Sequence, residues 1–310
     1  YFLKRPELLV PIAAALLAGS AHRQIARSLG CSPSTVTRLS ARLGRHALLL
    51  LARALSELHL RLDEPVVVDH FETFEFSQDL PFGIATAVGH RSWFLYALDP
   101  APHRSSLSRS RPPRPHRSTR GGYLGSTSRL LDTLTPLRPS NRRLHLIGDG
   151  HLAYDRAVRS HRLRSSILLE RHPNPPRGPK GSPRSARAIA RDRAMFPADT
   201  LHSLLRHSLA HHRRETIAFG RRLNALMERM FLTAAWRNFI KGRSERRPDP
   251  TTPAMRLGLT TRPWSWPAVL SRRLFPGREK LPPAWAQLYR REWTTPALAH
   301  NTRHHLRYAG

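Results

Sequence analysis

Two short apolar runs, each ending in an aspartate, constrain the fold of this chain most strongly. They are Pro65-Val-Val-Val-Asp69 and Leu144-His-Leu-Ile-Gly-Asp149. Short apolar runs rich in β-branched residues are typical of buried strands. Further strand candidates are residues 82–88, 93–98 and 165–169. Because a helical pattern at residues 124–134 and another after Asp149 alternate with these runs, we predict an α/β region with a mixed sheet over residues 65–170.

The preceding part of the chain, residues 5–62, has a helical pattern, and residues 23–38 match a helix-turn-helix. Ala26 is a small residue where a second helix must approach, and Gly30 lies at the turn. Ser32 is the expected N-cap of the second helix, and Pro33 occupies its first turn, where proline is tolerated. We predict that this helix ends near Leu43 and that a separate amphipathic stretch covers residues 48–62.

The helix-turn-helix pattern predicts a set of residues facing a DNA major groove, because the second helix of such a unit lies in that groove. The predicted DNA-binding residues are Arg23, Gln24, Ser34, Thr35, Thr37, Arg38 and Arg42. The alternative interpretation is a plain helical hairpin with a solvated basic face.

The charge of the chain points to the same class of partner. The 310 residues include 52 Lys and Arg against 21 Asp and Glu, which gives a formal net charge of +31. A polyanion relieves such an excess, and phosphate backbones release counterions when basic side chains neutralise them. A GC-rich genome would explain the preference for Arg over Lys, but it does not explain why so few acids balance the charge.

Because acids are scarce, their positions carry information. Asp69 and Asp149 each end a predicted strand, and Glu215 lies in a predicted helix within residues 201–241. Two strand ends and one helix can converge at an edge of a sheet, where carboxylate oxygens suit a pair of hard cations such as Mg²⁺ or Mn²⁺. Glu228 is the alternative third ligand, on the same predicted helix.

Two other acids are weaker candidates. Glu72 is a possible accessory ligand, but strand alternation directs it away from Asp69. Asp155 could replace Asp149, although it falls inside a predicted helix. The alternative for all of these acids is ordinary salt bridging on an Arg-rich surface.

Both aspartates belong to motifs that resemble those of a known family. Asp69-His-Phe-Glu-Thr-Phe-Glu75 resembles the first catalytic motif of a group of bacterial insertion-sequence transposases with a DDE-type catalytic domain, whose usual form is Asp-Glu-Phe-Glu-Thr-Phe-Glu. Gly148-Asp-Gly-His-Leu-Ala-Tyr154 is similar to their second motif. The resemblance extends over residues 5–260. This chain departs from the pattern at His70, where the family often has an acid.

The resemblance implies a ribonuclease H-like catalytic domain behind an N-terminal helix-turn-helix. It further implies metal-dependent cleavage and strand transfer at insertion-sequence ends, with Asp69, Asp149 and Glu215 as catalytic metal ligands for Mg²⁺ or Mn²⁺. The expected partners are double-stranded DNA, both transposon ends and target, and further copies of the chain on that DNA. The expected location is the bacterial cytoplasm, at the nucleoid. Two alternatives are a non-catalytic DNA-binding protein derived from a transposase and a nuclease acting on another nucleic acid.

The predicted domains are residues 1–62 (DNA binding), 63–242 (catalytic) and 243–310, a Pro- and Trp-rich extension. We expect the tryptophans of this extension to anchor irregular chain to a core, although stacking on DNA bases is the alternative. The single cysteine, Cys31, excludes a disulfide within the chain. No apolar run of about 18 residues predicts a membrane span. The chain starts at Tyr1 and not at Met, which suggests a fragment of a longer protein.

Overall fold

The computed structural model describes residues 3–75, 81–102, 122–176, 179, 182–213, 216–246 and 248–295. Five strands form one mixed sheet with the order β3-β2-β1-β4-β5. The strands are β1 (Val66–Phe74), β2 (Pro81–Gly89), β3 (Leu95–Pro102), β4 (Leu144–Gly148) and β5 (Ile167–Arg171). β2 is antiparallel to both β1 and β3. β4 is parallel to both β1 and β5. The predicted fold class, α/β with a mixed sheet, is confirmed.

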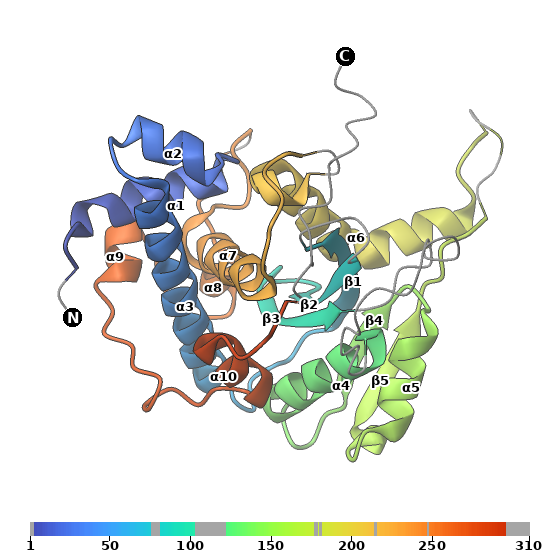
Figure 1. Ribbon diagram of the computed structural model, residues 1–310. Coiled ribbons are helices and arrows are strands. Elements are labelled where there is room, and N and C mark those ends of the chain that lie inside the picture. The colour runs from blue at the N-terminus through green and yellow to red at the C-terminus, as the bar shows by residue number, and fades with distance from the viewer. Residues whose placement is uncertain are drawn as a thin grey trace.

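Helices surround the sheet and form the N-terminal part of the molecule (Figure 1). The α-helices are α1 (Leu9–Leu17), α2 (His22–Ser28), α3 (Pro33–Glu57), α4 (Gly122–Leu134), α5 (Leu152–Ser160), α6 (Ala186–Ser208), α7 (Leu223–Ala235), α8 (Pro253–Arg256), α9 (Trp266–Leu270) and α10 (Pro283–Arg290). Among the helices that the structure describes, none is both long enough and apolar enough to cross a membrane.

The valines of β1 show why helices lie on both faces of the sheet. Successive side chains of a strand point to opposite faces. Val67 is buried with Met195 and Ala198 of α6, whereas Val66 and Val68 belong to the main core, which includes residues of α4 and α5. The apolar run therefore needs no polar face, which is the reason it lacks the alternation of a half-exposed strand.

The predicted strand at residues 93–98 is displaced toward the C-terminus, to β3. Trp93 has a φ of 65°, a conformation found in turns and rarely in strands. Its N–H donates to the Gly89 carbonyl, and the Gly89 N–H donates to the Phe94 carbonyl. Trp93 therefore belongs to the turn between β2 and β3.

The prediction that a helix ends near Leu43 and another begins at residue 48 is wrong, because α3 is one helix of 25 residues. Gly44 does not break it. A Cβ atom on Gly44 would lie 2.3 Å from the Glu228 carbonyl oxygen, so this glycine permits close contact between α3 and α7. Tertiary packing here outweighs the low helix propensity of glycine.

The single helix predicted over residues 201–241 is also wrong. α6 ends at Ser208, where Leu209 adopts an extended conformation with φ −117° and ψ 112°. α7 begins only at Leu223. The described part of the intervening chain includes the short 3₁₀ turn Ala210–His212, so Glu228 lies on a different helix from α6.

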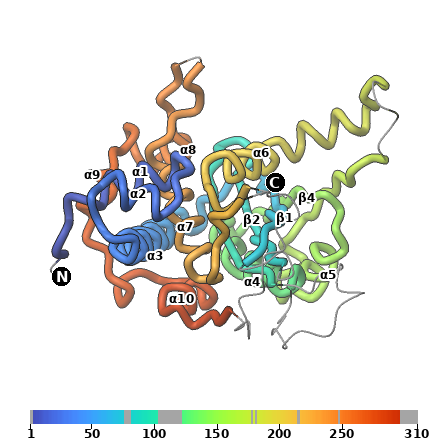
Figure 2. Tube along the Cα trace, turned by 45° about the horizontal axis from the view of Figure 1, so that its top comes forward, coloured from blue at the N-terminus to red at the C-terminus, as the bar shows by residue number. Residues whose placement is uncertain are grey.

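The N-terminal helices pack together on one side of the molecule (Figure 2). Buried residues of α1, α2 and the first half of α3 share a core with Leu232 of α7, against which Trp266 and Leu270 of α9 pack. The second half of α3, from Ala47 to Leu55, belongs instead to the main core with the sheet. Apolar packing therefore continues across the predicted domain boundary at residue 62.

The C-terminal residues also belong to the main body. Trp285 of α10 is 1% exposed, stacks edge-on against Phe231, and donates its Nε1–H to the Leu98 carbonyl of β3 (3.0 Å). Asn238 covers the same edge strand by hydrogen bonding both the N–H and the carbonyl of Leu95. The expected anchoring role is thus confirmed for Trp285, and these contacts protect the edge strand β3.

Candidate active site: carboxylates at one edge of the sheet

The structure brings Asp69 and Asp149 together beside the C-terminal end of β4, the acidic edge of the sheet. The prediction that Asp69 ends a strand is wrong, because β1 continues to Phe74, whereas Asp149 directly follows β4 as predicted. β1 and β4 are parallel neighbours in which Val67 pairs with Ile147. Each aspartate lies two residues beyond its paired valine or isoleucine, so both occupy the same level and the same face. Gly150 follows with a φ of +84°, which glycine adopts without steric cost, and turns the chain away from β4.

Helix α6 adds two further polar side chains to this edge. Met195 and Ala198 pack on the sheet beside the paired strand residues. Asp199 and His202 each lie four residues beyond one of these apolar contacts, so they continue the same helix face by one turn. The helix therefore presents a carboxyl and an imidazole where the two strands present their aspartates.

The electrostatics confirm that these acids influence one another. Burial raises the pKa of Asp69 to about 7, and the negative charges of Asp149 and Asp199 raise it further. The His70 N–H, which donates to Asp69 Oδ1 (2.7 Å), and the Arg191 guanidinium oppose this rise in pKa. The charged form of Asp69 is thus under-compensated by the surrounding protein.

His202 faces Asp69 as a neutral imidazole. Burial lowers the pKa of His202 to about 3. Thr86 Oγ1 donates to the Asp69 carbonyl and lies 3.1 Å from His202 Nε2, so Nε2 carries the hydrogen and donates to Thr86. His202 Nδ1 then presents a lone pair toward Asp69 Oδ2, 3.6 Å away. Two electron-pair donors that face each other in this way suit a shared cation.

Arg191 is the cation that α6 itself supplies. Its guanidinium forms an ion pair with Asp199, whose side chain is 39% exposed. Asp199 and Asp69 both raise the pKa of Arg191, although burial opposes them. Asp192 also pairs with Arg191, so this guanidinium interacts with three carboxylates, those of Asp69, Asp192 and Asp199.

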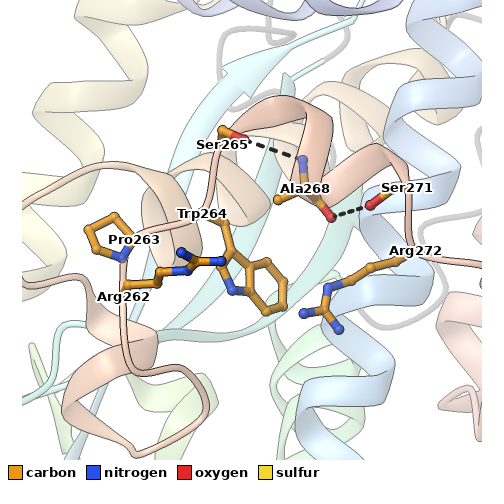
Figure 3. Close-up of a pocket in the computed structure, with 7 residues that line it drawn as sticks. All are labelled: Arg262, Pro263, Trp264, Ser265, Ala268, Ser271 and Arg272. Atoms are coloured by element: carbon orange, nitrogen blue, oxygen red, sulfur yellow. Dashed lines mark hydrogen bonds between the residues drawn. The ribbon is translucent and has the colours of Figure 1, made fainter.

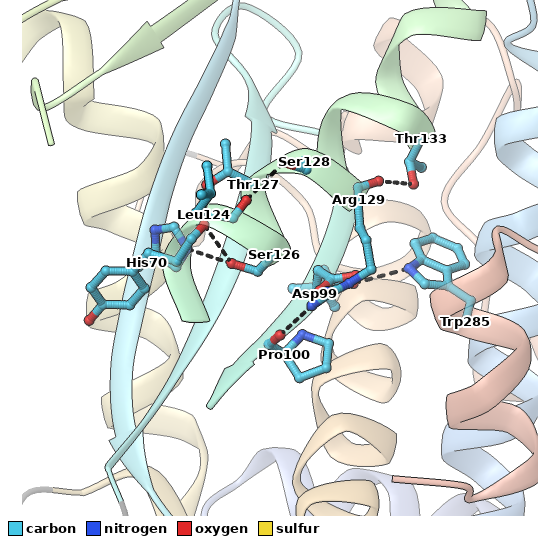
Figure 4. A network of polar contacts seen from close by, with 12 residues as sticks. His70, Asp99, Pro100, Leu124, Ser126, Thr127, Ser128, Arg129, Thr133 and Trp285 are labelled. Atoms are coloured by element: carbon cyan, nitrogen blue, oxygen red, sulfur yellow. Dashed lines mark hydrogen bonds and ion pairs between the residues drawn. The ribbon is translucent and has the colours of Figure 1, made fainter. Parts of the chain in front are cut away.

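The opposite face of β1 carries a hydrogen-bond chain that includes His70 (Figure 4). His70 Nε2 lies 2.9 Å from Ser126 Oγ, which itself donates to the Tyr123 carbonyl, so Nε2 donates to Ser126. His70 Nδ1 lies 2.9 Å from the Tyr154 hydroxyl, which also hydrogen bonds the Asp69 carboxylate. His70, the departure from the family pattern, thus connects β1 to α4 and α5.

Tyr154 contributes to the acidic edge as well. Its pKa is raised well above the ordinary value, first by burial and then by the charges of Asp69 and Asp149. The hydroxyl consequently stays protonated and can only serve as a neutral hydrogen-bond group here. Asp149 has a further local partner, because the His151 N–H donates to its Oδ1 (3.0 Å).

The donor chemistry of this edge fits a hard divalent cation in part. Asp69 and Asp149 supply carboxylate oxygens, the preferred ligands of Mg²⁺, and their mutual repulsion favours a cation between them. Across the described ranges, however, no group of three or more His, Cys, Asp or Glu side chains is placed to hold a metal ion. The two aspartates would hold the metal, and Asp199 is engaged by Arg191.

The other predicted acids have different environments. Glu215 lies outside the described residues. Glu228 is buried on α7, with ion pairs to Arg291 (2.9 Å) and Arg45 (3.9 Å), which is a structural role between α3, α7 and the C-terminal segment. Asp155 Oδ1 accepts from Arg171 Nε (2.8 Å).

Glu72 lies on β1 with the alternation of His70, not that of Asp69, and is exposed. Its charge does reach the Tyr154 hydroxyl, whose pKa it helps to raise. Glu72 therefore lies near the acidic edge, but its side chain is on the opposite face of β1 from that of Asp69.

The predicted DNA-binding residues are exposed with one exception. Arg23, Gln24, Ser34, Thr37, Arg38 and Arg42 are exposed, and Thr35 is half-buried. Ser32 caps α3 as predicted, since its Oγ accepts from the Thr35 N–H (3.2 Å). Thr37 Oγ1 donates to the Pro33 carbonyl. Arg42 has no hydrogen-bond partner within the part of the chain that the structure describes, so its guanidinium faces solvent.

Sequence reasoning missed Asp199, His202 and Arg191. The available signal was the spacing Met195, Ala198, Asp199 and His202, which places two apolar and two polar residues on one helix face. Residues 186–241 are predicted to be mostly helical, but only Glu215 and Glu228 were considered as ligands in that part of the chain.

No protein-family model matches the chain, and comparisons with curated proteins and with solved structures likewise return no significant match.

Proposed function

We propose that this protein is a transposase that cleaves and joins DNA with the help of divalent cations bound at the Asp69–Asp149 edge. The observation that carries the proposal is the placement of these two aspartates on adjacent parallel strands, each two residues beyond the Val67–Ile147 pair. The strand order β3-β2-β1-β4-β5, with helices after β3, β4 and β5, supports a ribonuclease H-like domain.

The N-terminal helices support the DNA-binding half of the proposal. α2 and α3 are joined by residues 29–32, and the buried Ile25, Ala26 and Val36 hold them to one core. Arg38 and Arg42 project from the exposed side of α3. We assign a helix-turn-helix role to this unit, with α3 entering the major groove. The proposed setting is the bacterial cytoplasm, with several copies of the chain acting together on DNA.

Each residue of the edge has a distinct task in this proposal. A bound Mg²⁺ or Mn²⁺ would lower the pKa of the attacking water or 3′-hydroxyl and stabilise the departing oxygen. Asp69 and Asp149 would hold the metal. His202 and Tyr154 place a neutral imidazole and a neutral hydroxyl beside Asp69. Arg191 opposes the rise in the pKa of Asp69. Asp199 restrains Arg191 through their ion pair.

One observation favours a second candidate, a DNA-binding protein that does not cleave. Among the described residues no group of three or more His, Cys, Asp or Glu side chains is placed to hold a metal ion, and the third carboxylate near the edge, that of Asp199, pairs with Arg191. Such a protein would bind DNA through the same N-terminal unit but would not cleave or join it.

An end-cleavage assay separates the two candidates. Purified protein is incubated with Mg²⁺ or Mn²⁺ and labelled DNA from the flanks of its coding region, and nicked or joined products are resolved by electrophoresis. Asp69→Asn and Asp149→Asn should each reduce the rate by at least about 1,000-fold, since loss of a metal-held nucleophile removes several kcal/mol of transition-state stabilisation.

Asp132→Asn is the matched control, because Asp132 is an exposed acid of α4 paired with His161. It should cleave at the wild-type rate. DNA affinity should stay unchanged in all three variants. Full activity in both edge variants would contradict the proposed site, and wild-type protein that binds but never cleaves would favour the second candidate.

A further inference from the structure

A cavity of about 490 Å³ lies next to the N-terminal helices, far along the chain from the acidic edge. Its lining comes from the segment before α9, from α9 and from the residues that follow it: Arg262, Pro263, Trp264, Ser265, Ala268, Ser271 and Arg272. Figure 3 shows the side chains of Arg262 and Arg272 reaching toward the Trp264 indole. The lining contains two cations and no acid.

Trp264 holds one of these cations in a fixed position. One face of its indole stacks on Phe239, with ring centroids 4.7 Å apart and an interplanar angle of 13°. The Arg272 guanidinium lies over the ring, 3.6 Å from its centroid. A guanidinium stacked on an aromatic ring loses little freedom on binding and keeps its in-plane N–H groups available. Because Phe239 and Arg272 already stack on the Trp264 indole, the ring is not a platform for a nucleobase.

The remaining groups complete a set of donors. Ser265 Oγ accepts from the Ala268 N–H (3.4 Å), which leaves its own hydrogen to donate. Neither Arg262 nor Arg272 has a hydrogen-bond partner within the described part of the chain, and both are exposed. Burial lowers the pKa of Arg272, and Glu57 is the acid that opposes this effect.

The walls of the cavity are rigid. His46 Nε2 of α3 lies 2.9 Å from the Val269 carbonyl, and Val269 is buried in the main core. Trp266 and Leu270 pack on the core of the N-terminal helices. The cavity is therefore fixed to the unit that carries Arg38 and Arg42.

We propose that the cavity formed by Arg262, Trp264, Ser265 and Arg272 binds a phosphodiester of the DNA backbone, as a contact separate from the major-groove face. The ligand chemistry is that of a tetrahedral oxyanion, which two guanidinium groups and a hydroxyl recognise. The choice of DNA as the source of this phosphate rests on the proposed function, whereas the anion site itself stands on the geometry.

The test measures the equilibrium affinity of a fluorescently labelled duplex of random sequence, without metal, at several salt concentrations. Arg262→Ala and Arg272→Ala should each weaken binding by about tenfold at roughly 0.1 M salt and reduce the slope of log affinity against log salt by about 1, as expected for one lost phosphate contact. Arg272→Lys should recover only part of the affinity, because lysine keeps the charge but loses the stacked fork.

Arg273→Ala is the matched control, since Arg273 is the exposed neighbour that does not line the cavity. It should change affinity less than twofold. If the two cavity variants behave like this control while the wild type binds duplex normally, the cavity assignment is wrong and the proposed function stands. Wild-type protein that binds no duplex would overturn both.

Inorganic phosphate distinguishes the two sources of the anion. Calorimetric titration with phosphate should give only weak binding that Arg272→Ala removes, with the duplex binding far more tightly. Tight phosphate binding together with unchanged duplex affinity in the variants would assign the cavity to a free anion and overturn the DNA contact.

Discussion

The acidic edge of the sheet and the arginine cavity beside α9 are opposite in charge and alike in organisation. At the edge, burial and the charges of Asp149 and Asp199 raise the pKa of Asp69 to about 7, and Arg191 opposes them. The lining of the cavity contains two arginines and no acid, and Glu57 acts on Arg272 from outside that lining. Each place thus carries charge that its own surroundings neutralise only in part, which is unfavourable unless a partner of opposite charge binds.

The positive and negative charges of the chain are therefore not paired evenly over the molecule. Elsewhere arginines meet acids directly, as in the pair of Arg53 Nη2 with Glu279 (2.8 Å) and the pair of Arg129 with Asp99. These ion pairs connect separate structural elements, and their charges are already neutralised within the protein. Function should therefore concentrate where the pairing fails, in one place for cations and in another for phosphate.

Removing the charge of Asp69 should produce the largest change in stability. The pKa of Asp69 is raised from its ordinary value near 4 to about 7 in the folded protein. Its contribution to stability is therefore present below pH 4 and is lost as the pH rises toward 7. Asp69→Asn should stabilise the metal-free protein at pH 8 by up to about 4 kcal/mol, because three pKa units correspond to that energy.

Chemical denaturation in EDTA at pH 4, 6 and 8 checks this expectation. The difference between Asp69→Asn and wild type should be small at pH 4 and grow with pH. A constant difference would mean that the edge is already neutralised, and the contrast with the arginine cavity would disappear.

Gly44→Ala tests whether the two places belong to one rigid body. A Cβ atom here would meet the Glu228 backbone at 2.3 Å, and two residues later His46 contacts the cavity wall. Overpacking of this kind costs about 3 kcal/mol. We expect a lower thermal midpoint for the whole protein in one cooperative transition. Two separate transitions would show that the N-terminal helices and the sheet unfold independently.

Arg42→Ala should have the smallest effect, on DNA affinity alone. Arg42 is an exposed cation of α3 without a partner among the described residues, so its loss should weaken duplex binding by about tenfold and leave folding stability unchanged. Arg290→Ala, which removes an exposed arginine already paired with Glu292 (3.0 Å), is the control. Equal effects of both variants in a binding titration would indicate that unpaired arginines have no special role.

The sequence was sufficient to predict five strand segments and the proximity of Asp69 to Asp149, because β-branched runs are local signals. It did not give the strand bounds, since β1 continues past Asp69 to Phe74 and β3 is displaced to Leu95–Pro102. It was insufficient for α3, since nothing local indicates that Gly44 lies against another helix instead of ending its own. The helix predicted over residues 201–241 was wrong because no glycine or proline at Leu209 indicates that the helix ends there. Asp199 was missed because no local signal shows that its face of α6 lies against β1 and β4.

The continuity of α3 has one more consequence. Its 25 residues span about 37 Å at 1.5 Å per residue, close to the roughly 34 Å of one turn of duplex DNA. Its first half packs in the core of the N-terminal helices and its second half in the core that includes the sheet. One helix thus joins the two cores without a linker, so the exposed arginines Arg38 and Arg42 are held at a constant spacing from the body of the molecule.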